Sequence, residues 1–152
     1  MSIERTLVLI KPDAVQRGLS GIVLSRLESR GLKPVAIKMV HVSKELASTH
    51  YEAQEGKPHY ESLVNFITSS PLIALVIEGH KAVEAVRSTM GSTDPVKSQP
   101  GTIRGDLGLD IQHNLIHGSD SIESAVVEIG LFFSQEEILA YDRDVDRWII
   151  ES

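Results

Sequence analysis

Leu72-Ile73-Ala74-Leu75-Val76-Ile77 is the most apolar run of the chain, and it stands between Pro71 and Gly79. A short apolar run between such turn residues indicates a β-strand. Residues 6–10, Thr-Leu-Val-Leu-Ile, predict a second strand, buried on both faces. Residues 34–42 instead alternate, which predicts a strand with one wetter face. The alternation places Val35, Ile37 and Met39 on one face and Ala36, Lys38 and Val40 on the other.

Helical patterns fill the segments between these strands. Ser20 is expected to cap a first helix that ends at Gly31, because serine accepts hydrogen bonds at a helix start and glycine tolerates the left-handed conformation at its end. Two short helices follow the alternating strand, one capped by Ser43 and one over residues 60–69. A further helix after the central strand is marked by Ala82, Val83, Val86 and Met90.

The last part of the chain begins with an irregular segment over residues 91–109, rich in glycine and proline. An irregular segment this long inside a compact domain is usually functional. Asp120, with Glu123 three residues further on, predicts a capped helix. One face of that helix is expected to contain Ile122, Ala125, Val126 and Ile129. Leu131-Phe132-Phe133 then predicts a short last strand.

The order of these elements is βαββαβ once the pair of short helices and the long loop are set aside as insertions. This order is typical of the ferredoxin-like α+β sandwich, a four-stranded antiparallel sheet with helices on one face. A chain of 152 residues is long enough to bury a substantial core, and we expect a single domain over residues 1–152.

The composition excludes several classes of protein. The chain is 41% hydrophobic and 24% charged, as soluble globular domains are. Its net charge of −6 argues against a nucleic-acid partner, and the absence of cysteine excludes disulfides and thiol catalysis. The N-terminus lacks the form of a signal peptide, and no apolar run approaches the roughly 18 residues of a membrane span. We therefore expect a cytoplasmic enzyme or binding protein without a membrane partner.

Asn114-Leu115-Ile116-His117-Gly118-Ser119-Asp120 places a histidine, a hydroxyl and a carboxylate directly before a predicted helix. A histidine can accept a phosphoryl group on one ring nitrogen while an acceptor holds the other. Glu128 can be that acceptor if the helix folds back over His117. Candidates for binding the phosphate oxygens are Lys11, Arg87, Arg104 and Thr93.

Other chemistries fit this stretch less well. His113 and His117 have the spacing of zinc ligands on a helix, but Asn114 and Gly118 are poor interior helix residues. Ser119 beside a histidine would suit a hydrolase, yet the Gly-x-Ser-x-Gly turn is missing. The phosphate-binding loop of P-loop kinases is also missing from the sequence. Residue chemistry alone leaves open whether His117 is catalytic or a packed histidine.

Four motifs occur in order along the chain. They are Lys11-Pro12-Asp13 with Gln16-Arg17-Gly18, Pro100-Gly101-Thr102-Ile103-Arg104-Gly105-Asp106, the stretch over residues 114–120, and Glu128. With them the sequence resembles the nucleoside diphosphate kinases from about residue 6 to about residue 133. The resemblance implies ping-pong exchange of the γ-phosphoryl group between nucleoside triphosphates and diphosphates, with Mg²⁺ held mainly by the nucleotide and water. The alternative is a catalytically silent relative that acts by binding partners, but such relatives lose the histidine or its supporting residues.

The resemblance also implies a role for each site residue. His117 would be phosphorylated, Glu128 would hold its ring, and Ser119 would support both. Around the nucleotide, Lys11 would contact phosphate and ribose, Tyr51 would lie beside the transferring group, Asn114 would hold a ribose hydroxyl, and Arg87, Thr93 and Arg104 would bind phosphates.

The chain departs from the family pattern where the base is held. A phenylalanine usually stacks on the base, whereas Lys57-Pro58-His59-Tyr60 places His59 at that position, with Ile111 expected on the other side of the base. Imidazole stacks on less area, so we expect broad base specificity with weaker binding. The resemblance further implies a homo-oligomer, and the length of the tail favours a hexamer over a tetramer.

Overall fold

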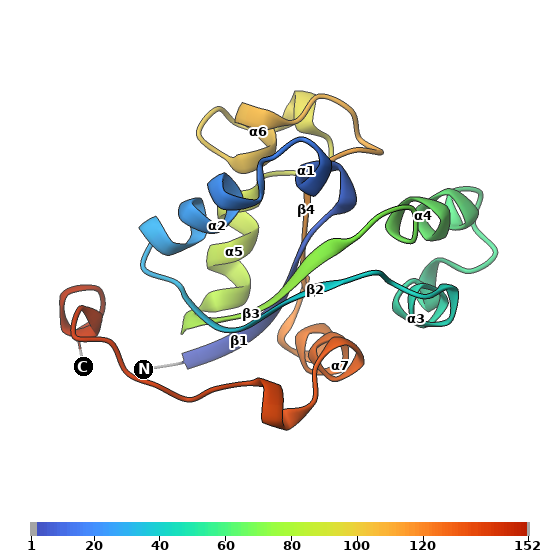
Figure 1. The fold of residues 1–152 in the computed structure, drawn as a ribbon. Helices are drawn as coiled ribbons and strands as arrows, with labels where there is room; N and C mark the ends of the chain where they lie inside the picture. The colour runs from blue at the N-terminus through green and yellow to red at the C-terminus, as the bar shows by residue number, and fades with distance from the viewer. Residues whose placement is uncertain (1–2, 152) are drawn as a thin grey trace.

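A computed structural model describes residues 3–151 and contains one sheet of four antiparallel strands in the order β2-β3-β1-β4 (Figure 1). The strands are β1 (Ile3–Ile10), β2 (Lys33–Val40), β3 (Leu72–His80) and β4 (Ile116–Gly118). The α-helices are α1 (Pro12–Gln16), α2 (Ser20–Ser29), α3 (Lys44–His50), α4 (Tyr60–Ile67), α5 (Ala82–Met90), α6 (Ile103–Leu107) and α7 (Ile122–Phe132). Short 3₁₀ turns are Glu52–Gln54, Pro95–Lys97, Gln135–Glu137 and Asp146–Trp148. Residues 1, 2 and 152 of the predicted single domain lie outside the described residues.

Helices cover both faces of the sheet (Figure 1). Successive side chains of a strand point to opposite faces, so Val8 and Ile10 pack with α2 and α5, whereas Leu7 and Leu9 pack with α3, α4 and α7. The predicted ferredoxin-like fold is confirmed, with α2 and α5 together on one face of the sheet. The prediction did not include the second layer, in which α3, α4 and α7 cover the other face. The reason lies in β1 and β3, which are apolar on both faces and need two covering layers.

The fourth strand is not the predicted one. Ile116–Gly118 forms it, with His117 opposite Leu9 of β1, whereas Leu131 and Phe132 end helix α7. A strand this short carries too few residues to show a period of two. The apolar residues 131–133 predict a strand because apolar residues at the end of a helix and in a short strand have the same local pattern.

Two predicted helix starts are displaced by one residue. Ser121, not Asp120, caps α7, because its Oγ accepts the N–H of Ser124 at 3.0 Å. Ser20 is the first residue of α2, and Leu19 takes the cap position. The predicted apolar face of α7 is also wrong in part, since Ile122 and Val126 are exposed while Ala125 and Phe132 are buried. The predicted cap at Ser43 and the glycine at the end of α2, Gly31 with φ +98°, are confirmed.

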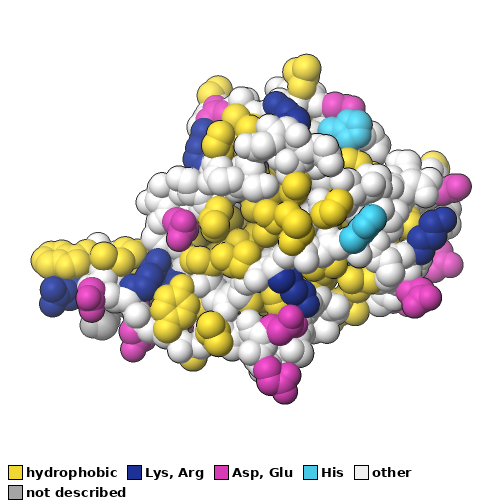
Figure 2. Space-filling view, viewed as in Figure 1, with side chains coloured by type: hydrophobic (Ala, Val, Ile, Leu, Met, Phe, Trp, Pro, Cys, Tyr) yellow, Lys and Arg dark blue, Asp and Glu magenta, His cyan; other side chains and the backbone are white. Residues whose placement is uncertain are grey.

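The predicted alternation of β2 is interrupted by a bulge between Pro34 and Ala36. The extra residue lets Val35 and Ala36 both enter the core, whereas Ile37 and Met39 are 53% and 63% exposed. Because β2 is an edge strand, this apolar pair lies at the rim of the sheet. Figure 2, drawn from the same side as Figure 1, shows hydrophobic side chains gathered across the middle of the molecule.

The C-terminal segment runs past the ends of the strands and finishes in a turn that stands away from the other helices (Figure 1). Its first part is anchored, because Leu139 N–H donates to the Val35 carbonyl and Arg143 donates to the Gly31 carbonyl. Its last part is less covered, and Trp148 is 78% exposed. Over residues 3–151, no helix combines the length and the apolar character needed to cross a membrane.

Candidate active site

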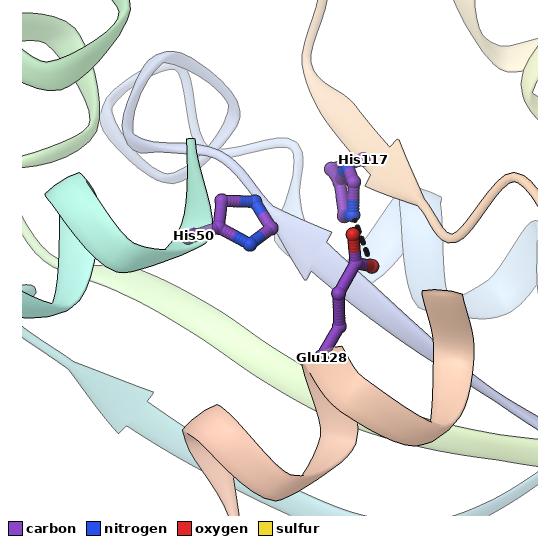
Figure 3. Close-up of side chains that lie close together, drawn as sticks. All are labelled: His50, His117 and Glu128. Carbon is purple, nitrogen blue, oxygen red and sulfur yellow. Dashed lines mark hydrogen bonds and ion pairs between the residues drawn. The ribbon is translucent and has the colours of Figure 1, made fainter. Parts of the chain in front are cut away.

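His117 lies in the middle of β4 with its ring turned toward helix α7 (Figure 3). Its Nε2 is 2.8 Å from Oε1 of Glu128, which α7 brings back over the sheet by packing on β1. The predicted return of the helix therefore occurs, and it joins two residues eleven positions apart.

Glu128 is held on the same oxygen by a second donor. The buried hydroxyl of Ser119 donates to Oε1 at 2.7 Å. Burial alone would raise the pKa of Glu128, but the hydrogen bonds from His117 and Ser119 lower it below its usual value. An ionised carboxylate only accepts hydrogen bonds, so Nε2 of His117 carries the proton and Nδ1 keeps the lone pair.

Two buried cations, Lys11 and Arg104, lie where β1 ends and β4 begins. Lys11 Nζ donates to Asn114 Oδ1 at 2.9 Å, and burial together with the charge of Arg104 lowers the pKa of Lys11 to about 8, partly opposed by Asp13. Arg104 donates to three backbone carbonyls, those of Asn114 at 3.1 Å, Ile116 at 2.6 Å and Gly91 at 3.2 Å. Burial and the charge of Arg87 lower the pKa of Arg104 to about 10, so the guanidinium is charged at neutral pH.

The turn between these cations and His117 is strained. Leu115 is buried and has φ +74°, a conformation that costs a residue with a side chain on the order of 1–3 kcal/mol. Asp13 Oδ2 accepts its N–H at 3.1 Å, and its carbonyl accepts the N–H of Lys11 at 2.8 Å. These contacts fix Asn114 on one side of the turn and His117 on the other. No sequence pattern had indicated this conformation.

The long loop also contributes to the site. Asn114 Nδ2 donates to the backbone carbonyl of Thr93 at 3.0 Å, and Arg87 donates to the carbonyl of Gly118 at 3.4 Å. The segment over residues 91–109, predicted to be irregular, contains a 3₁₀ turn and helix α6, and α6 supplies Arg104. The loop, α5 and β4 thus bring the predicted phosphate-binding residues around one place.

His50 belongs to the site, and sequence reasoning missed it. It ends α3, and its ring lies edge-on to that of His117, with 4.9 Å between the centroids (Figure 3). The rings of Tyr51 and Phe132 are also edge-on to it, with centroids at 4.7 Å and 5.5 Å. Burial and the neighbouring His117 lower the pKa of His50 to about 4, so this imidazole is neutral. Burial and Glu128 raise the pKa of Tyr51 to about 12. The sequence offered only one signal, a histidine beside Tyr51.

The two predicted base-holding residues lie outside this charged cluster. His59 precedes α4, is exposed, and has Nε2 2.8 Å from Gln54 Oε1. Ile111 lies in the loop before β4 and is 49% exposed. Both side chains have surface to offer a ligand, and their role stays a prediction.

Metal-binding side chains come together at one point in the described part of the chain. Ligand atoms of His50, His117 and Glu128 all lie within 4.8 Å of one another. His113, the other half of the zinc pair considered above, instead lies 3.4 Å from Asp110 and packs edge-on against Phe66.

Comparison with known proteins finds one family over most of the chain. The family model described as nucleoside diphosphate kinase matches residues 4–138. Proteins of that name from Thermomicrobium roseum and Carboxydothermus hydrogenoformans are 57% and 54% identical over 97% of this chain and 99% of their own length. A solved halophilic nucleoside diphosphate kinase from Halobacterium salinarum, in complex with CDP, has a TM-score of 0.96 at 49% identity, covering 99% of this chain and 100% of that one. A nucleoside diphosphate kinase family protein from Babesia bovis has a TM-score of 0.93 at 40% identity, covering 97% of this chain and 99% of that one.

Proposed function

The chain belongs to the nucleoside diphosphate kinase family and is a phosphotransferase of that family, and we propose that Nδ1 of His117 carries the transferred phosphoryl group. The observation behind this proposal is the pair of hydrogen bonds on Glu128, from His117 and Ser119. They fix the tautomer in which Nδ1 has a free lone pair.

Two half-reactions follow from this geometry. In the first, the Nδ1 lone pair attacks the γ-phosphorus of a nucleoside triphosphate, the bond to the bridging oxygen breaks, and a nucleoside diphosphate leaves. Positive charge that develops on the ring is stabilised by the carboxylate of Glu128. In the second, a different nucleoside diphosphate attacks the phosphohistidine, and the bond to Nδ1 breaks. The enzyme returns to its starting state without net loss of protons.

Phosphoryl transfer depends on charge placed around the equatorial oxygens of the transferring group. We assign that charge to Lys11, Arg87 and Arg104, with Thr93 as a further donor. Asn114 holds a ribose hydroxyl, and Tyr51 lies beside the transferring group. Buried cations are suited to this task, because an incoming phosphate meets them with little competing water.

Magnesium enters this scheme as part of the nucleotide. Mg²⁺ prefers several oxygen ligands, whereas the side chains assigned to the phosphates here are three cations and the single hydroxyl of Thr93. Within residues 3–151, the one cluster of three metal-binding side chains contains two imidazoles, which do not suit Mg²⁺. Bound Mg²⁺ would supply positive charge that offsets part of the phosphate charge, while Lys11, Arg87, Arg104 and Thr93 would orient the nucleotide.

The base is proposed to lie between His59 and Ile111. An imidazole face stacks on any base, so broad base specificity follows. The Halobacterium salinarum relative was solved with CDP, a nucleoside diphosphate, which supports this class of substrate for the present chain.

The assembly, location and domain organisation are also proposals. The exposed apolar residues Ile37, Met39 and Trp148 would lose contact with water in a homo-oligomer, and we propose a hexamer in preference to a tetramer. The whole chain forms one domain and acts in the cytoplasm, without a nucleic-acid or membrane partner. A catalytically silent binding protein is disfavoured, because the nucleophile and both of its supporting residues are present.

Steady-state kinetics test the proposed function. With two nucleotides varied together, a ping-pong mechanism gives parallel lines in double-reciprocal plots. His117→Gln should abolish exchange, whereas the matched control His113→Gln should retain it, since His113 lies on the exposed surface. Intersecting lines, or exchange that survives in His117→Gln, would contradict the proposal.

A further inference from the structure

Three side chains from three different elements meet beside β4. They are His50 at the end of α3, His117 in β4 and Glu128 in α7 (Figure 3). Each has one potential ligand atom within 4.8 Å of the other two. Metal ligands at about 2.0–2.2 Å from a common ion lie some 3–3.5 Å apart, so modest movements would close the cluster around an ion.

We propose that His50, His117 and Glu128 form a binding site for Zn²⁺ or a similar transition-metal ion in the nucleotide-free protein. Two imidazole nitrogens and one carboxylate oxygen are a donor set that suits zinc and is poorly suited to Mg²⁺. This site is therefore distinct in its chemistry from the magnesium that arrives on the nucleotide. Side chains of His117 and Glu128 are 21% and 17% exposed, which leaves an approach for the ion and a position for water as fourth ligand.

His50 is the residue that makes this proposal specific. Both of its ring nitrogens are buried, and within the described residues neither has a hydrogen-bond partner. Buried polar atoms are normally paired, and an orphaned one calls for an explanation. Its ring is also fixed by edge-on contacts with Tyr51 and Phe132, so little ordering is needed to bring a nitrogen to an ion. A bound ion would give one of these nitrogens its missing partner.

The bound ion would block the nucleophile. Neutral His117 carries one proton, on Nε2, and that nitrogen points at Glu128. If Nε2 bonds to the metal, its proton moves to Nδ1, and Nδ1 then has no lone pair with which to attack phosphorus. This consequence rests on the proposed function, whereas binding of the ion does not. Transition metals should therefore inhibit phosphorylation of His117.

Calorimetric titration of the nucleotide-free protein with Zn²⁺ tests the site directly. The parent should bind one ion per chain, and His50→Phe, which keeps an aromatic ring in place, should weaken binding at least about tenfold. Glu128→Gln keeps the shape of the side chain and should weaken binding similarly. The control His113→Gln removes the other histidine that lies beside a carboxylate, and it should leave the affinity unchanged.

Far-UV circular dichroism shows whether each variant is folded. If His50→Phe is misfolded, the zinc affinity of Glu128→Gln tests the site. Equal affinity in the parent and the folded variants, or loss of binding in His113→Gln instead, would overturn the site. A second measurement follows phosphorylation of the parent by a labelled nucleoside triphosphate after preincubation with Zn²⁺. Labelling at an unchanged rate would overturn the inhibitory effect, whereas no labelling even without Zn²⁺ would count against the proposed function and leave the binding result standing.

Discussion

The state of His117 is set by the atoms around its second ring nitrogen. Because Glu128 takes one hydrogen bond from Nε2 and another from Ser119, it holds both the tautomer and the plane of the ring. A glutamine at position 128 has the same size but offers an amide, so it can present either a neutral oxygen or a competing donor to Nε2.

Glu128→Gln is therefore expected to lower kcat by about 10–100-fold, the loss that corresponds to a hydrogen bond with a charged partner. Glu123→Gln, on an exposed position of the same helix, is the matched control and should retain the parent rate. Rapid-quench measurement of the phosphorylation step separates this effect from nucleotide binding. A parent-like rate for Glu128→Gln would remove the positioning role assigned to the carboxylate.

The lowered pKa of Lys11 predicts that the protein takes up a proton when it binds a nucleotide. The Lys11 pKa of about 8 lies below its usual 10.5 because of burial, so free protein at pH 9 has largely lost this charge. Bound phosphate favours the charged form and draws a proton from solution. The lowered pKa also makes the free energy of unfolding depend on pH. Below pH 8 the buried charge of Lys11 destabilises the folded protein, and this destabilisation decreases as the pH rises from 8 toward 10.5.

We expect proton uptake on nucleoside diphosphate binding near pH 9, where the phosphates are fully ionised and Lys11 is largely neutral. Calorimetry in buffers with different ionisation enthalpies measures it. Lys97→Met, which removes an exposed lysine, should keep the uptake, while Lys11→Met should lose it. Uptake that is absent at pH 9 in the parent, or unchanged in Lys11→Met, would disprove the linkage.

His59 gives the residue-scale prediction for the base. His59→Phe offers a larger ring face and no polar nitrogen, so nucleotide affinity should rise a few-fold for all bases alike. The substitution also breaks the contact with Gln54. Gln54→Ala removes that contact alone and serves as the control. Affinity that is unchanged or lower in His59→Phe, measured by fluorescence or calorimetry, would count against stacking at this position.

Residue types and their order predicted most of the charged side chains that gather at the site. They could not predict His50, because its place depends on how α3 packs on α7, and a histidine at the end of a helix has no pattern of its own. They also could not predict the left-handed Leu115, since leucine is a residue that normally avoids this conformation.

At the scale of elements, β4 and the exposed face of α7 could not be predicted from the periodicity of apolar residues. The three long strands were found because each carries enough residues to show its burial pattern. β4 is defined by its partner β1 rather than by its own residues, and α7 exposes valines that a helix of this length would usually bury. Such features depend on contacts between elements that are distant in the sequence, and no local pattern encodes them.

Helix α6 yields a prediction on its glycine. A Cβ at Gly105 would lie 2.1 Å from the carbonyl oxygen of Gln99, and this contact is with backbone that cannot rotate away. Gly105→Ala should destabilise the protein by about 1–3 kcal/mol and weaken nucleotide binding, because α6 holds Arg104. Gly130, in α7, has open space around a Cβ, and Gly130→Ala should be neutral or stabilising by up to about 1 kcal/mol. Urea denaturation measures both, and equal stabilities would contradict the packing described.

At the scale of the whole molecule, the proposed hexamer predicts a mass. Sedimentation at micromolar concentration should give about six times the chain mass of 16.7 kDa. Met39→Lys places a charge at the exposed edge of β2 and should lower that mass if this edge lies within the assembly. A mass of four chains, or a monomer, would refute the hexamer without affecting the chemistry proposed at His117.

Trapping the phosphoryl group on the protein tests the central claim most directly. The protein is incubated with a nucleoside triphosphate labelled in the γ-phosphoryl group, separated from nucleotide, and digested for mass spectrometry. We predict label that is labile in acid and stable in base, carried by the peptide that contains His117, absent in His117→Gln, and released by any nucleoside diphosphate. Absence of label from the parent, or label that persists in His117→Gln, would contradict the mechanism.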